Sequence, residues 1–142
     1  MDSDDISLPD RFAKQVNYLD KNPDVGVLGT AAQNFGANSN ICYNAEIIDA
    51  MTLLRGVAFY HPSIMMRRSI LTSHNISYNK DFYLVEDYEL WTQLLKFTKL
   101  RNLQEILLKY RVHSLSVSVK NKELQEQNKQ LVRQNILNYI SS

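Results

Sequence analysis

Two adjacent carboxylates, Glu86 and Asp87, stand where an apolar run meets a helical pattern. The run covers 82–85, and apolar residues then recur at 90, 91, 94 and 95, which fits one face of a helix. Negative charge near a helix N-terminus is stabilised by the helix dipole. The pattern leaves two interpretations open. One is a capping residue with a first-turn acid, and the other is a general base at the mouth of a cleft.

A second acidic group opens the chain, with carboxylates at Asp2, Asp4 and Asp5. Chain ends are commonly disordered, so an acidic tip without function is one interpretation. The other is a site for a hard cation, because Mg²⁺ and Mn²⁺ take oxygen ligands from one or two carboxylates and from phosphates. Alternate residues of an extended segment point the same way, so Asp2 and Asp4 can face one site.

Histidine and arginine add weaker signals. Pro62 favours an extended conformation at His61, which is either a partly buried, hydrogen-bonded histidine or an acceptor contact. His113 ends the segment 110–113 and stands alone there, a pattern more typical of a structural residue than of a metal ligand. Arg67 and Arg68 are either a solvated strand end or a phosphate contact.

The first half of the chain predicts short elements around one buried strand. Ser7–Asp10 has the form of a capping box, and apolar residues at 8, 12, 16 and 19 predict a helix over about 8–21. The apolar run 25–30 predicts the buried strand, and the polar stretch 31–44 a loop or ragged hairpin. Ile47, Met51 and Leu54 predict a short helix that ends at Gly56.

The second half predicts further strands and two longer helices. The first is a mostly extended segment 57–67, interrupted by His61-Pro62, and a short helix 69–73 and a loop 74–80 follow it. A helix of about 87–97 comes next, then one or two short strands within 100–112 with a turn near 102–105, and a last helix of about 119–140 capped by Ser118. The last helix carries an apolar stripe that we expect to pack on the domain, formed by Leu124, Leu131, Val132, Ile136 and Ile140.

Composition bounds the class of protein. The length suits one domain, and a net charge of +1 without a basic run gives no reason to expect nucleic acid as a partner. The single Cys42 excludes an intramolecular disulfide and suits a reducing compartment. No transmembrane segment or signal peptide is expected. We therefore expect a cytoplasmic protein, with the inner face of the membrane as a further possibility.

Three motifs in order carry a resemblance to a known family. Asp2-Ser3-Asp4-Asp5, the segment EDYELW at 86–91 and Tyr110-Arg111-Val112-His113 resemble the motifs of family-2 glycosyltransferases of the GT-A fold. The likeness covers about 1–118 and includes His61-Pro62-Ser63 and Met66-Arg67-Arg68. It implies an α/β class and a partial GT-A fold, with a mixed sheet and flanking helices. On this resemblance, residues 1–118 would form the acceptor-side half, and we expect the amphipathic helix 119–142 to pack on it.

The resemblance also implies roles for individual residues. Transfer of a sugar from a nucleotide-diphosphate sugar to an acceptor hydroxyl would proceed with inversion and the help of Mn²⁺ or Mg²⁺. The resemblance implies Asp87 as the base and Glu86 as the residue that orients it or binds the acceptor. It implies Asp2, Asp4 and Asp5 as donor-binding residues, and Asp4 and His113 as metal ligands. Trp91 and His61 are implied as acceptor-binding residues.

The family's domain begins with a nucleotide-binding half that we do not find in this sequence. At about 30 residues per βαβ unit, roughly 90 residues would precede Asp2. We therefore expect an acceptor half that is inactive alone and whose open sheet edge favours self-association. Once completed, it would take a nucleotide-diphosphate sugar and a sugar or lipid-linked acceptor. A non-catalytic carbohydrate-binding or interaction module is the alternative, and an α/β domain with acidic caps is a third.

Overall fold

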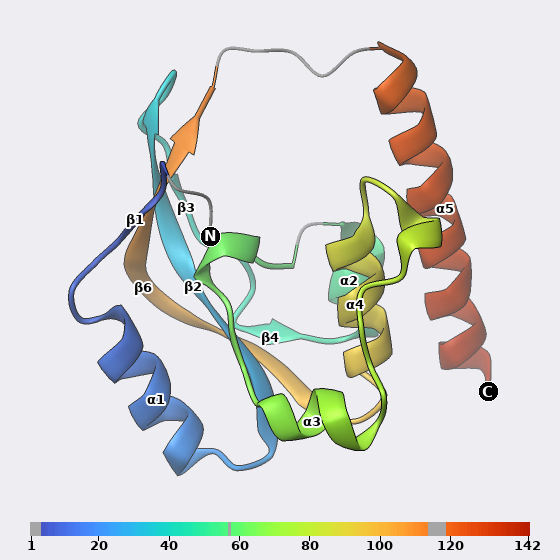
Figure 1. Ribbon diagram of the computed structural model, residues 1–142, viewed down its shortest axis with the longest axis horizontal. Helices are drawn as coiled ribbons and strands as arrows, with labels where there is room; N and C mark the ends of the chain where they lie inside the picture. Colours follow the sequence, from blue (N-terminus) through green and yellow to red (C-terminus); the bar gives the residue numbers. More distant parts are fainter. Residues whose placement is uncertain (1–3, 57, 114–118) are drawn as a thin grey trace.

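The computed structural model of the protein describes residues 4–56, 58–113 and 119–142. A mixed sheet lies at the centre, with helices on both faces (Figure 1). Its two long strands, β2 (Val25–Gly36) and β6 (Lys99–Val112), run parallel. Parallel neighbours need a crossover connection, and here the chain between them supplies two of the helices that cover one face. The expected α/β class with a mixed sheet and flanking helices is confirmed.

Short strands complete the sheet around this parallel pair. The strand order is β1-β6-β2-β3, and in addition β4 pairs with β6 and β5 pairs with β2. Each of the four short strands is antiparallel to the long strand that it pairs with. Their bounds are β1 Ile6–Ser7, β3 Ile41–Cys42, β4 Ile47–Ile48 and β5 Met65–Met66. The segment 31–44 is thus a hairpin of β2 and β3. The loop alternative was wrong for 31–36, which continue β2.

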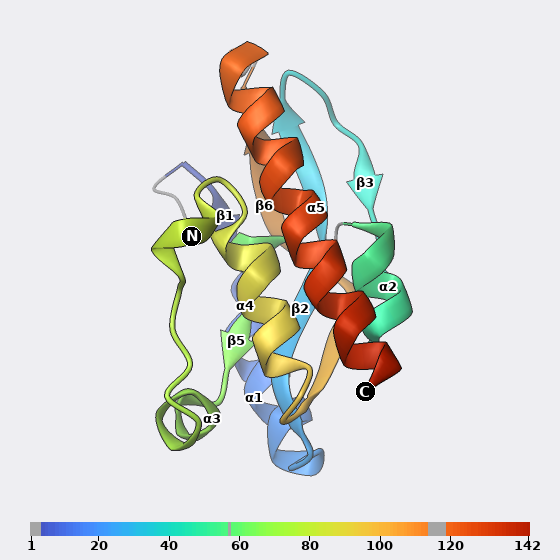
Figure 2. The same cartoon turned by 90° about the vertical axis from the view of Figure 1, so that its right-hand side faces the viewer.

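The helices divide between the two faces of the sheet. Helix α1 (Arg11–Lys21) covers one face, and α2 (Ala50–Arg55), α4 (Glu86–Leu94) and α5 (Val119–Ser141) lie together over the other (Figures 1 and 2). Helix α3 (Arg68–Ser73) and the 3₁₀ turns η1 (His61–Ser63) and η2 (Lys80–Phe82) connect them. The turn η1 falls at the interruption predicted at His61-Pro62, but the extended conformation expected of His61 itself was wrong, because His61 is the first residue of the turn.

One large hydrophobic core joins the sheet to α2, α4 and α5. Its fully buried members include Leu53 of α2, Leu94 of α4 and Leu100 of β6, together with Val132 and Ile136 of α5. Helix α5 therefore packs on α2 and α4, as expected from its apolar residues. The buried stripe is narrower than predicted, because Leu124, Leu131 and Ile140 are exposed. Ser118, the predicted cap, lies outside the described residues.

Helix α1 buries Leu19 as predicted, but the rest of its buried face differs from the predicted stripe. Phe12 and Val16 are 59% and 47% exposed, whereas Arg11 and Gln15 are buried. The Gln15 amide donates to the carbonyl oxygens of Leu28 and Ser63 at 2.9 and 2.8 Å. Buried carbonyl oxygens need hydrogen-bond donors, and Gln15 supplies them here. A polar side chain therefore faces the sheet, although the apolar spacing predicted that aliphatic residues would do so.

The predicted capping box at Ser7–Asp10 was also wrong. Ser7 belongs to β1, where it pairs with Leu108, and the helix begins only at Arg11. The Ser7 hydroxyl accepts a hydrogen bond from Arg11 Nε at 2.7 Å instead of capping the helix. Strand pairing with β6 keeps this segment extended for longer than the local pattern indicated. Likewise Ile47 lies in β4, and α2 begins only after the Asp49 cap.

Strand β6 is continuous where the sequence predicted a turn. The polar run near 102–105 is instead a register irregularity, because Thr30 pairs with Leu103 and Ala31 with Ile106. Asn102 is buried, and its amide donates to the carbonyl oxygens of Ala45 and Ala58 at 2.9 and 2.8 Å. A residue type common in turns therefore satisfies two carbonyls of the crossover, and the strand continues past it.

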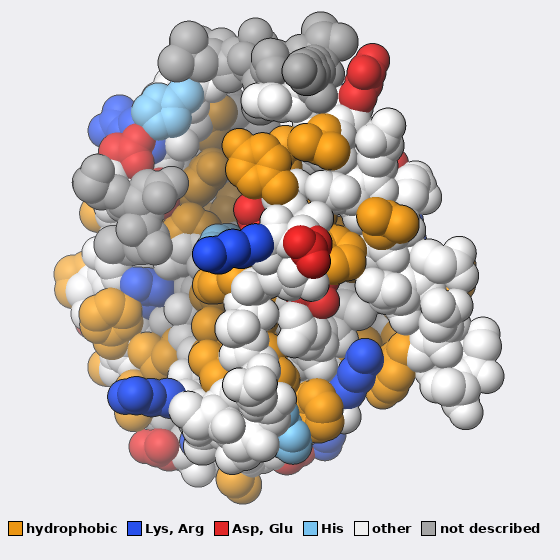
Figure 3. All heavy atoms as spheres, turned by 45° about the vertical axis from the view of Figure 1, so that its right-hand side comes forward, with side chains coloured by type: hydrophobic (Ala, Val, Ile, Leu, Met, Phe, Trp, Pro, Cys, Tyr) orange, Lys and Arg blue, Asp and Glu red, His pale blue; other side chains and the backbone are white. Residues whose placement is uncertain are grey.

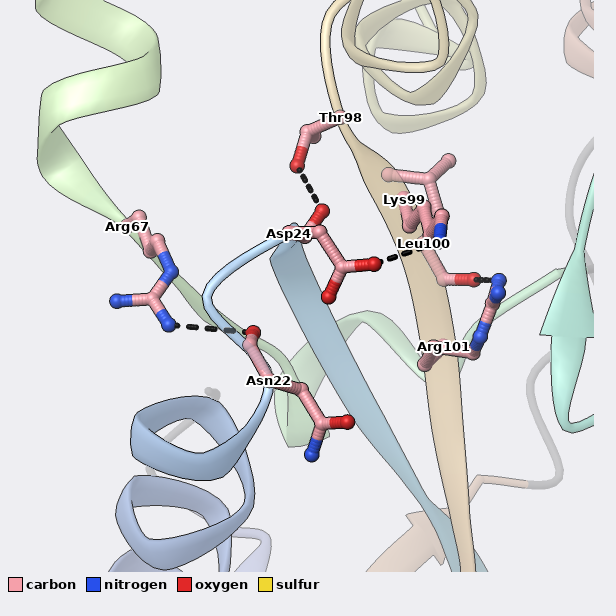
Figure 4. A network of polar contacts seen from close by, with 7 residues as sticks. All are labelled: Asn22, Asp24, Arg67, Thr98, Lys99, Leu100 and Arg101. Carbon is pink, nitrogen blue, oxygen red and sulfur yellow. Dashed lines mark hydrogen bonds and ion pairs between the residues drawn. The ribbon is translucent and has the colours of Figure 1, made fainter.

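Arg67 is a structural residue and not a solvated strand end. Its guanidinium donates to the carbonyl oxygens of Val25 at 2.8 Å and Asn22 at 3.4 Å, and also to that of Leu19. Figure 4 shows the hydrogen bond from Arg67 to the Asn22 carbonyl, close to Asp24 and the start of β2. The side chain therefore joins the last turn of α1, the start of β2 and β5.

We expect Arg67→Ala to lower the free energy of unfolding by about 1–3 kcal/mol, because it leaves several half-buried carbonyls without their donor. The measurement is urea unfolding followed by circular dichroism. Arg68→Ala is the matched control, since Arg68 is exposed and should change stability little. Equal unfolding midpoints for the two variants would contradict the structural role.

Candidate functional site

The acidic pair begins a helix, as the sequence predicted. Glu86 and Asp87 are the first two residues of α4, which ends at Leu94, short of the predicted end near 97. The N-cap residue Val85 offers no side-chain hydrogen bond to the free N–H groups of the first turn. Asp87 is half-buried, and its Oδ1 accepts a hydrogen bond from the Tyr88 backbone N–H at 2.8 Å. The second carboxylate oxygen therefore remains available for other chemistry.

Helix α5 fixes the backbone just before this pair. Leu84 has a φ of +70°, a conformation that costs energy for a residue with a branched side chain. Asn128 Nδ2 donates to the Tyr83 carbonyl at 2.8 Å, and Gln125 Nε2 donates to the Leu84 carbonyl at 3.2 Å. These two bonds from α5 hold the strained turn in place and thereby the start of α4.

Sequence reasoning missed Gln125 and Asn128 as supports of the site. One signal was present, since Asn128 stands four residues before Val132 and eight before Ile136, on the face that becomes buried. A polar residue inside a buried stripe needs a hydrogen-bond partner. Which carbonyl it would meet depends on the tertiary contact between α5 and the 83–84 turn.

Asp87 lies where two surface hollows meet. The first has a volume of about 420 Å³ and a floor that includes Phe59, Val85 and Trp91. The second, of about 630 Å³, is lined by His61, Tyr78, Lys80, Tyr83 and Glu86. Asp87 borders both hollows, whereas Glu86 borders only the second. Figure 3 shows apolar, acidic and basic side chains close together on this side of the molecule.

His61 and Trp91 lie near one another beside Asp87. Their ring centroids are 5.9 Å apart, and Trp91 packs edge-on against Phe59 at 5.0 Å. Trp91 is only 3% exposed, so packing accounts for most of its contacts, and an acceptor contact through its edge in the first hollow stays a prediction. His61 is exposed, and its Nε2 lies 2.9 Å from the Tyr78 hydroxyl.

Tyr78 links this histidine to the acidic pair electrostatically. Burial and the nearby Asp87 carboxylate both raise the pKa of the Tyr78 phenol. A raised pKa keeps the phenol protonated at neutral pH, where it donates a hydrogen bond. The second hollow therefore presents a hydroxyl donor, an imidazole and two carboxylates, a polar set suited to sugar hydroxyls.

The N-terminal acids meet the end of β6. Asp4 Oδ2 lies 2.6 Å from His113 Nε2 and 3.9 Å from Arg111 Nε. Asp5 is buried, and its Oδ1 accepts a hydrogen bond from the Arg111 backbone N–H at 3.0 Å. Asp4 and His113, which are far apart in the sequence, are thus brought together. Asp2 lies outside the described residues.

These residues fit a divalent cation in part. Asp4 and His113 supply an oxygen and a nitrogen ligand, a donor set that suits Mn²⁺ better than Mg²⁺. Among the described residues, no group of three His, Cys, Asp or Glu side chains is arranged to hold a metal ion. Asp5 Oδ2 is buried and receives no hydrogen bond within the described residues. An ion here would need ligands from phosphate or water as well.

Comparison with known proteins shows sequence similarity to glycosyltransferases. The chain is 30% identical to an uncharacterized glycosyltransferase of Haemophilus influenzae, over 99% of this chain and 48% of the relative. It is 33% identical to the O-antigen biosynthesis glycosyltransferase WbnJ of Escherichia coli, over 82% of this chain and 47% of the relative. No family model matches the chain.

The fold is also shared with a solved structure. S. aureus TarS 1-349, crystallised in complex with UDP, matches with a TM-score of 0.69 at 14% identity. The match covers 97% of this chain and 40% of TarS 1-349. The chain is similar to glycosyltransferases and has the fold of part of one. It spans less than half the length of each of these relatives. None of the described helices combines the length and the hydrophobicity that a membrane-spanning helix needs.

Proposed function

We propose that this chain supplies the acceptor side of a family-2, GT-A glycosyltransferase that transfers a sugar from a nucleotide-diphosphate sugar to an acceptor hydroxyl. The position of Asp87 carries the proposal. Its carboxylate lies at the first turn of a helix and borders two hollows large enough for sugar-sized ligands. The similarity to glycosyltransferases supports the same reaction class.

The proposed reaction is a single displacement with inversion at the anomeric carbon. The acceptor oxygen forms a bond to that carbon while the bond from the carbon to the phosphate oxygen breaks. The acceptor proton passes to a carboxylate oxygen of Asp87, which acts as a general base. The nucleoside diphosphate leaves with the bonding electrons. Glu86 and the Tyr78 hydroxyl, in the second hollow, orient hydroxyl groups by hydrogen bonds.

The donor side of the proposal rests on the ends of β1 and β6. Asp4 and His113 would hold Mn²⁺ or Mg²⁺, and Asp2 and Asp5 complete the acidic motif. When bound, the ion neutralises the charge that develops on the departing diphosphate. Asp5 holds the Arg111 backbone in place through its hydrogen bond, so its role is to position the segment that carries His113.

A non-catalytic carbohydrate-binding or interaction module is the second candidate. It is favoured by the incomplete metal site, since Asp4 and His113 have no third ligand of the usual types among the described residues. Such a module would bind sugars in the hollows beside Asp87 without a divalent ion. Metal dependence therefore separates the two candidates.

Release of nucleoside diphosphate from a panel of nucleotide sugars tests the proposal. Because the relatives are longer, the assay uses the longest reading frame that contains this chain. We expect transfer with Mn²⁺ or Mg²⁺ and a fall to background when the ion is chelated, with recovery on its return. Full transfer in the presence of chelator would overturn metal assistance. A folded protein that binds sugars and releases no diphosphate would support the module.

Asp4→Asn is expected to weaken Mn²⁺ binding, because it removes the charged ligand of the pair with His113. Titration followed by the electron paramagnetic resonance of free Mn²⁺ measures this without any turnover. Asp10→Asn is the control, since Asp10 is an exposed acid six residues along the chain. Equal Mn²⁺ affinity in both variants would exclude Asp4 as a ligand.

A further inference from the structure

The first hollow beside Asp87 has a basic wall that the proposed reaction does not use. Its floor is apolar, with Phe59, Val85 and Trp91, and its rim carries Arg55, Lys129 and Arg133. Arg55 comes from the last turn of α2, and the other two come from α5. Two helices that are distant in sequence therefore bring positive charge to one cavity.

The two cations of α5 are neighbours on one helical face. Lys129 and Arg133 are four residues apart, a spacing at which like charges repel by a few tenths of a kcal/mol. Arg133 is partly compensated by Glu126, whose Oε1 lies 3.0 Å from Arg133 Nη1. Among the residues that the structure describes, no ion pair involves Arg55 or Lys129, although the Glu126 carboxylate also attracts Lys129 at longer range.

Among the residues that the structure describes, Asp87 is the only carboxylate on the wall of this hollow. The three cations face Asp87 on the wall, and Glu126 pairs with Arg133 beside it, so a smaller net positive charge remains in a partly enclosed space, where charges are less screened than on an open surface. The position of Arg55 is explained by the helix dipole, because a positive charge is favourable at the C-terminus of α2. Lys129 lies in the middle of α5, half-buried, and the dipole of its helix gives no reason for its position.

Two hydrogen bonds connect the walls of the hollow. The Tyr88 hydroxyl donates to the Leu53 carbonyl at 2.6 Å and so ties α4 to α2. Asn128, next to Lys129 in α5, donates to the Tyr83 carbonyl at 2.8 Å and ties α5 to the turn before α4. Preorganised cations lose less entropy when they bind an anion than cations on mobile loops.

We propose that this hollow is an anion subsite that binds a phosphate or diphosphate group of the acceptor and so presents the acceptor hydroxyl to Asp87. The inference rests on the proposed function for the identity of the acceptor, but binding of the anion does not depend on turnover. The volume of about 420 Å³ lies within the range of small-molecule sites. The apolar floor accommodates the face of a sugar ring, and the basic rim takes the phosphate oxygens.

Titration of the chain with inorganic pyrophosphate, without divalent ions, tests the subsite by calorimetry. We expect saturable binding at one site, and Lys129→Gln and Arg55→Gln should each weaken it at least about tenfold through loss of a charge-assisted contact. Lys122→Gln is the matched control, because Lys122 is an exposed lysine of α5 outside the hollow and should leave the affinity unchanged. Absence of saturable binding, or equal weakening in all three variants, overturns the subsite.

Transfer kinetics in the longest reading frame separate the sources of the phosphate. If the bound phosphate belongs to the acceptor, Lys129→Gln raises the KM for the acceptor and leaves the KM for the nucleotide sugar unchanged. A raised KM for the nucleotide sugar alone would assign the hollow to the donor and overturn the proposal. Vesicles that carry a lipid diphosphate, compared with a soluble sugar phosphate, then show whether the acceptor is lipid-linked, since only the true source competes with pyrophosphate.

Failure of the subsite and failure of the proposed function have different signatures. Pyrophosphate binding that is lost in Lys129→Gln, in a protein that transfers no sugar, keeps the anion site and removes the sugar-transfer proposal. Transfer that proceeds normally in Lys129→Gln, with pyrophosphate affinity equal to that of the unaltered chain, removes the anion site and keeps sugar transfer.

Discussion

Asp87→Asn is expected to reduce sugar transfer by about 10²–10⁴-fold, the usual contribution of a positioned general base. The amide is the same size as the carboxylate but cannot take a proton from the acceptor hydroxyl. Its oxygen can still accept the hydrogen bond from the Tyr88 N–H, so the start of α4 keeps its form. Loss of the negative charge at the helix N-terminus costs only about 0.3–1 kcal/mol.

Steady-state kinetics of the longest reading frame, together with calorimetry of donor binding, measure this effect. The turnover number should fall, and the affinity for the nucleotide sugar should stay near that of the unaltered protein. Asp81→Asn is the matched control, since Asp81 is an exposed acid in the turn before α4. Near-normal turnover of Asp87→Asn would show that another group takes the proton.

Glu86 and Asp87 differ in what surrounds them, although the sequence places them side by side. Asp87 borders both hollows and Glu86 only the second. This difference supports the assignment of the base to Asp87 and of an orienting role to Glu86. The family resemblance already implied different roles for the two residues, and the placement of α4 beside α5 adds a physical difference between them.

Periodicity predicted the elements whose own residues determine their structure. The acidic start of α4 and the apolar run at the start of β2 follow from local pattern and burial together. Prediction failed where a polar residue packs inward. Gln15 and Asn102 are buried because each donates to two main-chain carbonyls from other parts of the chain. Such contacts are tertiary, and neither helical nor strand periodicity in the sequence can predict them.

In the candidate site, too, the local pattern predicted local features and did not predict tertiary contacts. The motif at Glu86–Trp91 predicted a helix N-terminus, and the pairing of Asp4 with His113 was implied by the family resemblance before the structure placed them 2.6 Å apart. The basic wall of the first hollow was not predicted. Arg55, Lys129 and Arg133 come from α2 and α5, and their charges meet only because both helices pack around α4.

Trp91→Ala is expected to lower the free energy of unfolding by about 3–5 kcal/mol, as for other large aromatic residues removed from a core. Trp91 is 3% exposed and packs edge-on against Phe59. A loss of this size is a large part of the 5–15 kcal/mol that stabilises an ordinary domain. Urea unfolding followed by far-ultraviolet circular dichroism is the measurement, because Trp91 is the single tryptophan and its fluorescence disappears in the variant.

Trp91→Phe separates packing from contact with the acceptor. The smaller ring still meets Phe59, so most of the stability should remain, and a loss as large as that of Trp91→Ala would contradict the packing argument. The edge of Trp91 also borders the first hollow, next to Asp87. If that edge contacts the acceptor, the phenylalanine variant should raise the KM for the acceptor while the affinity for the nucleotide sugar stays the same. An unchanged KM in a stable Trp91→Phe protein would limit Trp91 to the core and leave acceptor recognition to the polar residues of the second hollow and the basic wall of the first.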